Sequence, residues 1–186
     1  MNKLKFALVI TAVIATALPA MAQRKRVSPH ETITATVDGD KLTLVYGRPY
    51  TKDPKTGEVR KIWGGLVPYG KVWRTGADEA TLLTTEQTIV VGGTAVPAGT
   101  YSLFTLPAAD GTAKLIINKR TGQWGIPYKE ASEATNELAR IDLKKDTLDK
   151  TVDQFTMAID SSSTGGGVLK MSWENTGFSV PFTVKK

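Results

Sequence analysis

The feature that most constrains the fold is a series of short segments in which apolar residues occupy every second position. Residues 32–37 and 41–46 alternate in this way and flank Asp38-Gly39. A two-residue Asp-Gly connection between alternating segments is a strong signal for a β-hairpin. Such a turn would place Ile33 opposite Leu44, on one shared face. The sequence therefore predicts an antiparallel hairpin with one buried face.

Further short segments of this kind follow, separated by turns rich in Gly, Pro, Asp and Asn. We expect one strand at Lys71–Arg74, separate strands at Ala139–Lys145 and Val152–Asp160, and a turn at 175–177. Lys129–Ala139 is the only helical candidate, because its Ala, Glu and Leu residues favour a helix weakly. About ten short strands with at most one short helix are typical of a β-sandwich or a flattened barrel. The predicted fold is therefore all-β, in a single domain.

The N-terminus has the composition of a secretory signal peptide. Lys3 and Lys5 precede an apolar run at residues 7–18, and a small-x-small pattern ends at Ala22. This order predicts a signal peptide at residues 1–22, cleaved before Gln23, and an exported domain at 23–186 in the periplasm or outside the cell. The apolar run is shorter than the about 20 residues that a membrane span needs. We expect no span after cleavage.

Composition excludes several kinds of chemistry. The chain has no cysteine, which excludes disulfides, thiolate metal ligands and a cysteine nucleophile. His30 is the only histidine, which excludes metal centres with two or three histidines. The 24 Lys and Arg residues, two of them in the signal peptide, exceed the 18 Asp and Glu residues only mildly. Because these charges form no basic stripe, we expect no nucleic-acid partner. No motif for a nucleotide or haem is present, so the cofactor stays unknown.

Six blocks of sequence carry a resemblance to a known family. The longest is K-I-W-G-G-L-V-P-Y-G-K-V-W-R-T-G-A-D-E-A-T at 61–81, and the others lie at 26–31, 46–49, 96–104, 123–125 and 173–175. With these blocks the chain resembles the bacterial DUF2911 family over nearly all of residues 23–186. The resemblance implies a secreted or periplasmic single β-domain and brings no established activity. Similar proteins usually read T-G-A-N-E-A-T where this chain has Asp78, which puts any inherited role of that position in doubt.

Aromatic side chains and arginines gather between residues 46 and 74, and aromatic faces beside polar donors resemble sugar-binding surfaces. Arginine suits carboxylate or phosphate because its planar fork binds two oxygens. Trp124 lies in turn-rich sequence, where an exposed tryptophan is expected. The candidate ligand-binding residues are His30, Arg48, Trp63, Arg74, Asp78, Glu79 and Trp124.

Each candidate also has a purely structural interpretation. Arg74 and Glu79 flank a four-residue turn and would form a cross-strand ion pair in a simple hairpin. His30 would cap the first strand, and the aromatic residues would belong to the core. Trp73 should face away from Arg74 and join that core.

Three hypotheses on function follow. The leading one is an exported binding protein for a small polar ligand or a glycan. The first alternative is an enzyme, a hydrolase or isomerase, that uses His30 with Glu79 or Asp78, either alone or with one metal ion. The second alternative is a structural envelope-interaction module. The sequence assigns no catalytic residue and no metal ligand set, and it leaves the oligomeric state open.

Overall fold

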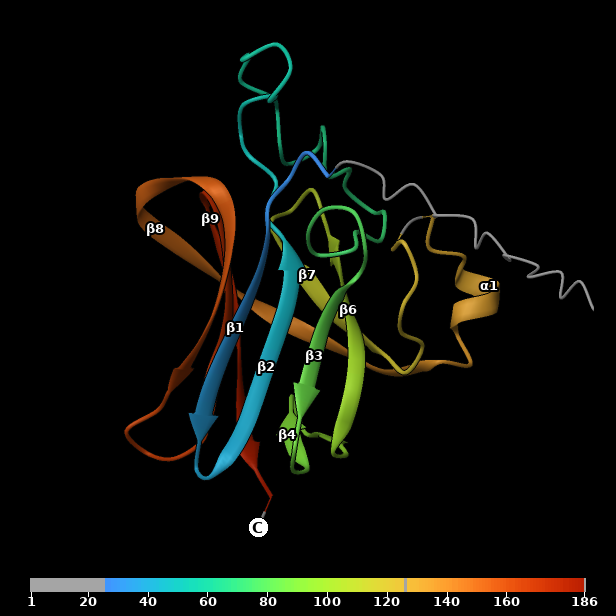
Figure 1. Cartoon of the computed structure of the whole chain (residues 1–186), viewed down its shortest axis with the longest axis vertical. Helices are drawn as coiled ribbons and strands as arrows, with labels where there is room; N and C mark the ends of the chain where they lie inside the picture. Colours follow the sequence, from blue (N-terminus) through green and yellow to red (C-terminus); the bar gives the residue numbers. More distant parts are fainter. Residues whose placement is uncertain (1–25, 126, 186) are drawn as a thin grey trace, which may run out of the picture.

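A computed structural model describes residues 26–125 and 127–185, so the expected signal peptide and its cleavage site lie outside the described residues. The described part of the chain forms one sheet of nine antiparallel strands in the order β1-β2-β3-β6-β7-β8-β9-β4-β5, with one short helix, α1 (Glu130–Glu133) (Figure 1). The mostly β fold is confirmed, in a sheet that does not close into a barrel. The strands are β1 (His30–Val37), β2 (Asp40–Gly47), β3 (Thr81–Thr85), β4 (Ile89–Val91), β5 (Thr94–Val96), β6 (Gly99–Pro107), β7 (Ala113–Asn118), β8 (Glu137–Ser161) and β9 (Gly167–Val184).

The first hairpin has the predicted register. Ile33 pairs with Leu44, and Val37 pairs with Asp40 across the turn. Asp38 and Gly39, the two turn residues, both have positive φ, at 49° and 85°. Two consecutive residues of positive φ match the right-handed twist of the flanking strands. The turn therefore sets which face of β1 and β2 is buried.

The C-terminal third differs from the prediction. One long strand, β8, replaces the two expected at 139–145 and 152–160, and β9 runs through the turn expected at 175–177. The β8–β9 register jumps from Thr147↔Thr176 to Val152↔Glu174, so β8 carries extra residues there. Glu174 has a φ of 51°. Turn-forming residues on both strands thus bend the paired ribbon at one place instead of ending it.

The bend lets the second half of β8 return to the first hairpin. The Tyr46 hydroxyl on β2 accepts a hydrogen bond from the Met157 main-chain nitrogen at 3.0 Å and donates one to Glu31 at 2.8 Å. The Arg48 Nε donates to the Phe155 carbonyl oxygen at 3.1 Å. Burial raises the pKa of Tyr46 to about 12. These bonds close one core between the two halves of the folded sheet.

Aromatic residues fill the core at the end of the sheet where the long loop 48–80 lies. Trp73 stacks on Trp173 at 5.9 Å between ring centroids and meets Phe155 edge-on at 5.0 Å. Trp73 is 8 % exposed and Trp173 is fully buried, which confirms the expectation for Trp73. Lys71–Arg74 is not a strand, because Trp73 makes only an isolated bridge to Thr105. The loop is therefore held by its tryptophan rather than by a ladder of main-chain bonds.

The helix prediction was too long. Residues 137–139 of the predicted segment belong to β8, where they pair with β7, and only Glu130–Glu133 are helical. Pairing with an existing strand outweighs the weak helix propensity of this segment. Among the described residues, no helix is long and apolar enough to cross a membrane.

We predict that Phe155→Ala lowers the free energy of unfolding by about 3–5 kcal/mol, because the ring is 1 % exposed and its removal leaves a cavity beside two tryptophans. Urea denaturation followed by tryptophan fluorescence measures the change. Val59→Ala, at a side chain 68 % exposed, is the control and should stay within about 0.5 kcal/mol of the wild type. A loss below 1 kcal/mol for Phe155→Ala would contradict this packing.

Candidate functional site

The segment 74–80 connects the irregular loop to β3, and its backbone is unusual. Thr75 and Asp78 have positive φ, at 54° and 65°. Most residues avoid this left-handed region, whereas Asn and Asp enter it several-fold more often. Thr75 is buried, and its hydroxyl lies 2.7 Å from that of Thr105. Strained backbone held by such bonds is typical of functional sites.

Two glycines let neighbouring chain segments approach this loop. A Cβ on Gly47 would lie 2.2 Å from the Ala77 carbonyl oxygen, and a Cβ on Gly125 would lie 2.7 Å from the Arg74 Cβ. The Ala77 nitrogen donates to the Gly47 oxygen at 3.2 Å. On the other side, the Ala80 nitrogen donates to the Gln123 carbonyl oxygen at 3.2 Å. The segment is therefore clamped between the end of β2 and the turn at 123–125.

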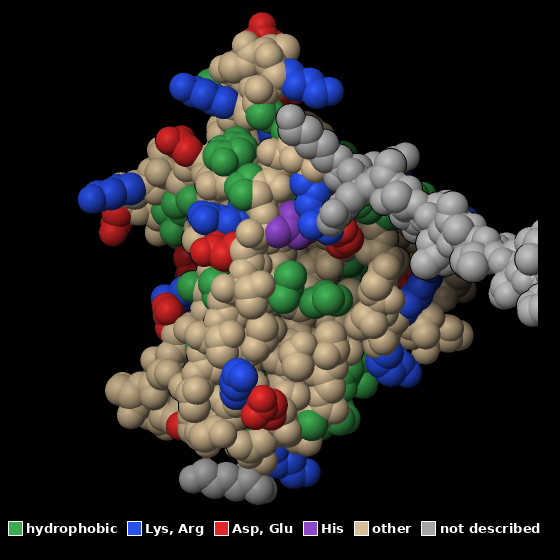
Figure 2. Space-filling view, viewed as in Figure 1, with side chains coloured by type: hydrophobic (Ala, Val, Ile, Leu, Met, Phe, Trp, Pro, Cys, Tyr) green, Lys and Arg blue, Asp and Glu red, His purple; other side chains and the backbone are tan. Residues whose placement is uncertain are grey.

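Three candidate residues come together at this clamp. The His30 Nε2 lies 3.4 Å from the Asp78 Oδ2 and 3.4 Å from the Glu79 Oε2. One ligand atom from each residue lies within 4.8 Å of the other two. His30 opens β1, whereas Asp78 and Glu79 come from the strained segment. Figure 2 shows the single histidine at the surface with acidic and basic side chains beside it.

Glu79 has one satisfied oxygen and one unsatisfied oxygen. Its Oε1 forms an ion pair with Arg26, while its buried Oε2 has no hydrogen-bond partner among the described residues. Burial raises the pKa of Glu79, but the hydrogen bond from Arg26 and the charges of Arg26 and His30 outweigh it, so the pKa lies below its ordinary value. Glu79 is thus a carboxylate with an acceptor oxygen directed at the cluster.

Arg74 does not form the expected ion pair with Glu79. Within the described residues, its Nη1 donates to the carbonyl oxygens of Asp78 at 3.0 Å and Trp124 at 3.4 Å. The four-residue turn is not a hairpin turn, because its positive-φ residues redirect the chain. Burial lowers the pKa of Arg74, and the charges of Asp78 and Glu79 oppose that shift. Arg74 therefore supports the segment and supplies positive charge beside the cluster.

A cleft of about 260 Å³ adjoins the cluster at Asp78. Arg60 and Arg74 both line it, and the Nε of each is buried with no hydrogen-bond partner among the described residues. Arg60 also donates to the Tyr50 carbonyl oxygen. The lining residues are Val27, Ser28, Pro49, Tyr50, Pro54, Arg60, Leu66, Trp73, Arg74, Gly76, Ala77, Asp78 and Trp173. Two guanidinium groups and aromatic walls make this cleft suited to a small anionic or polar ligand.

The other three candidates lie elsewhere. Arg48 is bound to Glu31 at 3.1 Å and to β8, so it ties strands together. Trp63 packs edge-on against Trp73 at 6.2 Å and belongs to the border of the core. Trp124 is 42 % exposed, as expected for a loop tryptophan, and lines a different cleft. Of the seven candidates, the structure thus brings His30, Arg74, Asp78 and Glu79 together and places the other three outside this group.

Sequence reasoning missed Arg26 and Arg60 at this site. Arg26 opens the block R-V-S-P-H-E that contains His30, so its place in that block was the available signal. Arg60 closes a polar loop that reads as exposed surface. It reaches the cleft because the loop folds back, and the Arg60 main-chain nitrogen donates a hydrogen bond to the Thr51 carbonyl oxygen at 3.0 Å. No local sequence pattern predicts that this loop folds back to the cleft.

The positive φ of Asp78 makes a prediction about substitutions. Asp78→Asn should leave the free energy of unfolding within about 0.5 kcal/mol of the wild type, because an amide tolerates this conformation equally well. Asp78→Val should lower it by about 1–2 kcal/mol, because a β-branched side chain is strained there. Urea denaturation measures both. Equal stability of the two variants would contradict the left-handed backbone at this position.

Four of the other five blocks that carry the family resemblance meet the segment 74–80, which itself belongs to the block 61–81. They are 26–31 through His30, 46–49 through Gly47, 123–125 through Gly125, and 173–175 through Trp173 at the cleft wall. A family model described as "Protein of unknown function (DUF2911)" matches residues 28–182. No curated protein and no solved structure matches this chain. The chain therefore belongs to the DUF2911 family.

Proposed function

We propose that this chain is an exported protein that holds one divalent metal ion through His30, Asp78 and Glu79 and binds a small polar or anionic ligand in the adjoining cleft. The observation that carries the proposal is the convergence of one imidazole nitrogen and two carboxylate oxygens at the strained segment. The proposed site contains four of the seven candidate residues, namely His30, Arg74, Asp78 and Glu79, together with Arg26 and Arg60.

The spacing of the three atoms supports a metal ion. Protein nitrogen and oxygen ligands lie about 2.0–2.2 Å from zinc in tetrahedral sites, so two such ligands lie about 3.4 Å apart. Both distances from the His30 Nε2, to Asp78 and to Glu79, are 3.4 Å. That separation is long for a hydrogen bond. An ion at the centre would satisfy the Glu79 Oε2, which has no hydrogen-bond partner in the described structure.

The charges around the cluster favour a bound anion beside the metal ion. Two carboxylates and one neutral imidazole would leave a divalent ion with no net charge at the site. Arg60 and Arg74 then leave the cleft positively charged, and neither forms an ion pair within the described residues. A carboxylate or phosphate group in the cleft would satisfy this charge.

A second candidate function is hydrolysis at the same site. Within the part of the chain that the structure describes, three protein groups form the cluster, and catalytic metal sites with three protein ligands keep a position for a water molecule. Metal binding lowers the pKa of such a water and makes it a nucleophile. This version retains the enzyme alternative with His30, Asp78 and Glu79. The structural-module alternative has less support, because it leaves the cluster and the cleft without a role.

We expect the full chain, freed of metal with a chelator, to bind one equivalent of Zn²⁺ or Mn²⁺ in isothermal titration calorimetry. Glu79→Gln should weaken binding by about tenfold or more, because it removes a charged ligand. The matched control is Glu86→Gln, at an exposed carboxylate that lies 4.0 Å from Lys41 outside the site. Absence of stoichiometric binding, or equal affinity in wild type and Glu79→Gln, would reject the metal site.

A further inference from the structure

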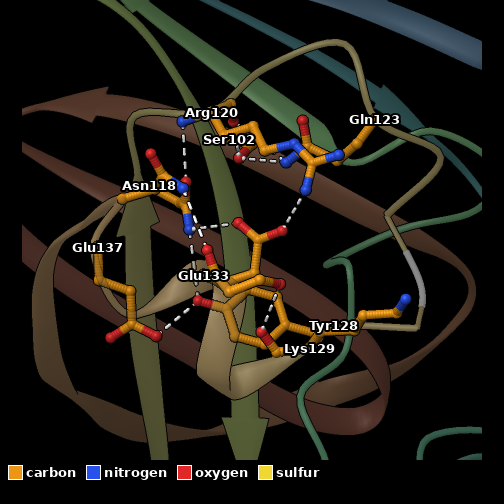
Figure 3. Close-up of polar contacts among 10 residues, drawn as sticks. Ser102, Asn118, Arg120, Gln123, Tyr128, Lys129, Glu133 and Glu137 are labelled. Carbon is orange, nitrogen blue, oxygen red and sulfur yellow. Dashed lines mark hydrogen bonds and ion pairs between the residues drawn. The ribbon is translucent and has the colours of Figure 1, made fainter.

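A second cleft, of about 190 Å³, is lined in part by the turn at 123–125, which packs closely on the segment 74–80. Two hydrogen bonds tie that turn to the segment 74–80: the Trp124 carbonyl oxygen accepts from Arg74, and the Gln123 carbonyl oxygen accepts from the Ala80 nitrogen. Phe104 of β6, the turn after β7, residues 127–128 and Glu133 of helix α1 line it. The close-up in Figure 3 shows Tyr128 and Glu133 beside Asn118 and Arg120. Its lining residues are Phe104, Arg120, Gln123, Trp124, Gly125, Pro127, Tyr128 and Glu133.

A buried carboxylate forms the floor of this cleft. Glu133 is 5 % exposed and Asn118 is fully buried. The Glu133 Oε1 accepts from the Arg120 Nη1 at 2.5 Å, and its Oε2 accepts from the Asn118 Nδ2 at 3.2 Å. A charge buried to this degree needs such partners. Because a carboxylate oxygen accepts more than one hydrogen bond, Glu133 keeps acceptor capacity for a ligand.

Tyr128 adds an aromatic wall with a fixed hydroxyl. Its hydroxyl donates to the Glu137 Oε1 at 2.5 Å and accepts from the Asn118 Nδ2 at 3.3 Å. Burial raises the pKa of the Tyr128 phenol, and the hydrogen bond to Glu137 raises it further. The phenol is therefore neutral across the physiological range. Its ring meets Phe104 edge-on at 4.7 Å, which fixes the ring plane.

Gln123 supplies an acceptor that nothing in the described structure uses. Its Nε2 donates to the Ser102 hydroxyl at 3.0 Å and to the Arg120 carbonyl oxygen at 3.1 Å. Both donors of the amide are thus engaged and the amide orientation is set. Its Oε1 is buried and has no hydrogen-bond partner among the described residues. Leaving a buried acceptor unpaired costs about 1–3 kcal/mol, which a hydroxyl donor would offset.

We propose that this second cleft binds one neutral sugar ring. The charges of Arg120 and Glu133 balance, so the lining favours neither an anion nor a cation. Trp124 and Tyr128 offer aromatic faces for the C–H groups of a sugar, and Trp124 is 42 % exposed. A carboxylate, an amide and a guanidinium group are planar, two-pronged partners for neighbouring hydroxyls.

The size of the cleft narrows the ligand further. Sites for drug-sized molecules occupy about 300–1,000 Å³, whereas this cleft has about 190 Å³. One ring of a monosaccharide, or the terminal ring of a longer chain, therefore fits better than several rings. This site is separate from the metal cluster, because His30, Asp78 and Glu79 are not among its lining residues.

The polar network also has a structural effect that the experiment must separate from binding. Glu133 and Tyr128 fasten α1 and the segment before it to β7 and β8. Trp124→Ala removes the proposed stacking surface without touching Glu133 or Asn118, so it tests binding while the buried network stays intact.

The test uses the full chain and a panel of neutral monosaccharides and their methyl glycosides, including glucose, galactose, mannose and N-acetylglucosamine. Saturation-transfer NMR detects binding, and calorimetry measures it. We expect saturable binding of at least one sugar, weakened about tenfold or more in Trp124→Ala. Tyr69→Ala is the matched control, because Tyr69 is also 42 % exposed and lies outside this cleft. It should bind as the wild type does.

Two further variants complete the test. Glu133→Gln should weaken the same sugar about tenfold or more, provided that its thermal unfolding shows a folded protein. Glu79→Gln and a metal chelator should leave sugar binding unchanged, so the failure of the metal proposal would not affect this one. The proposal is overturned if no sugar of the panel saturates the protein, if Trp124→Ala binds as the wild type does, or if binding is lost with Glu79→Gln.

Discussion

The structure depends on the close approach of two chain segments to residues 74–80. The end of β2 reaches this segment through Gly47, and the turn at 123–125 reaches it through Gly125. A side chain at either glycine would meet main-chain or Cβ atoms. Because both neighbours press on it, the segment keeps left-handed residues that an isolated loop would avoid. Both proposed ligand sites adjoin this clamp: the cluster with His30 includes Asp78 and Glu79 of the segment, and the cleft with Trp124 is lined by the turn that packs on it.

Sequence reasoning succeeded where the cause of structure is local. The Asp38-Gly39 turn predicts the register of β1 and β2 because both residues adopt positive φ, and alternation predicts most of the short strands. It failed at the bend shared by β8 and β9, where turn residues on two strands oppose each other. Each strand alone reads as interrupted. Only the pairing, which is not visible in either segment, shows that the interruption is a bend.

The candidate site shows the same division. His30, Arg74, Asp78 and Glu79 were identified because unusual residue types mark them in the sequence. Arg48 and Trp63 were assigned on residue type as well, yet one ties strands together and the other borders the core. Glu133 lies on α1, and the partners of its carboxylate come from β7 and the turn that follows it. Contacts between residues far apart in the sequence leave no pattern of spacing, so residue type alone cannot show which residues share a pocket.

The ion pair between Arg26 and Glu79 has a practical consequence for anyone who handles this protein. Arg26 lies four residues before His30, at the start of β1, whereas β9 ends at the opposite end of the sheet (Figure 1). A histidine-rich affinity tag joined just before Arg26 would add imidazole groups within a few residues of the cluster, where they would compete for a metal ion. Purification through the C-terminus leaves that entrance clear.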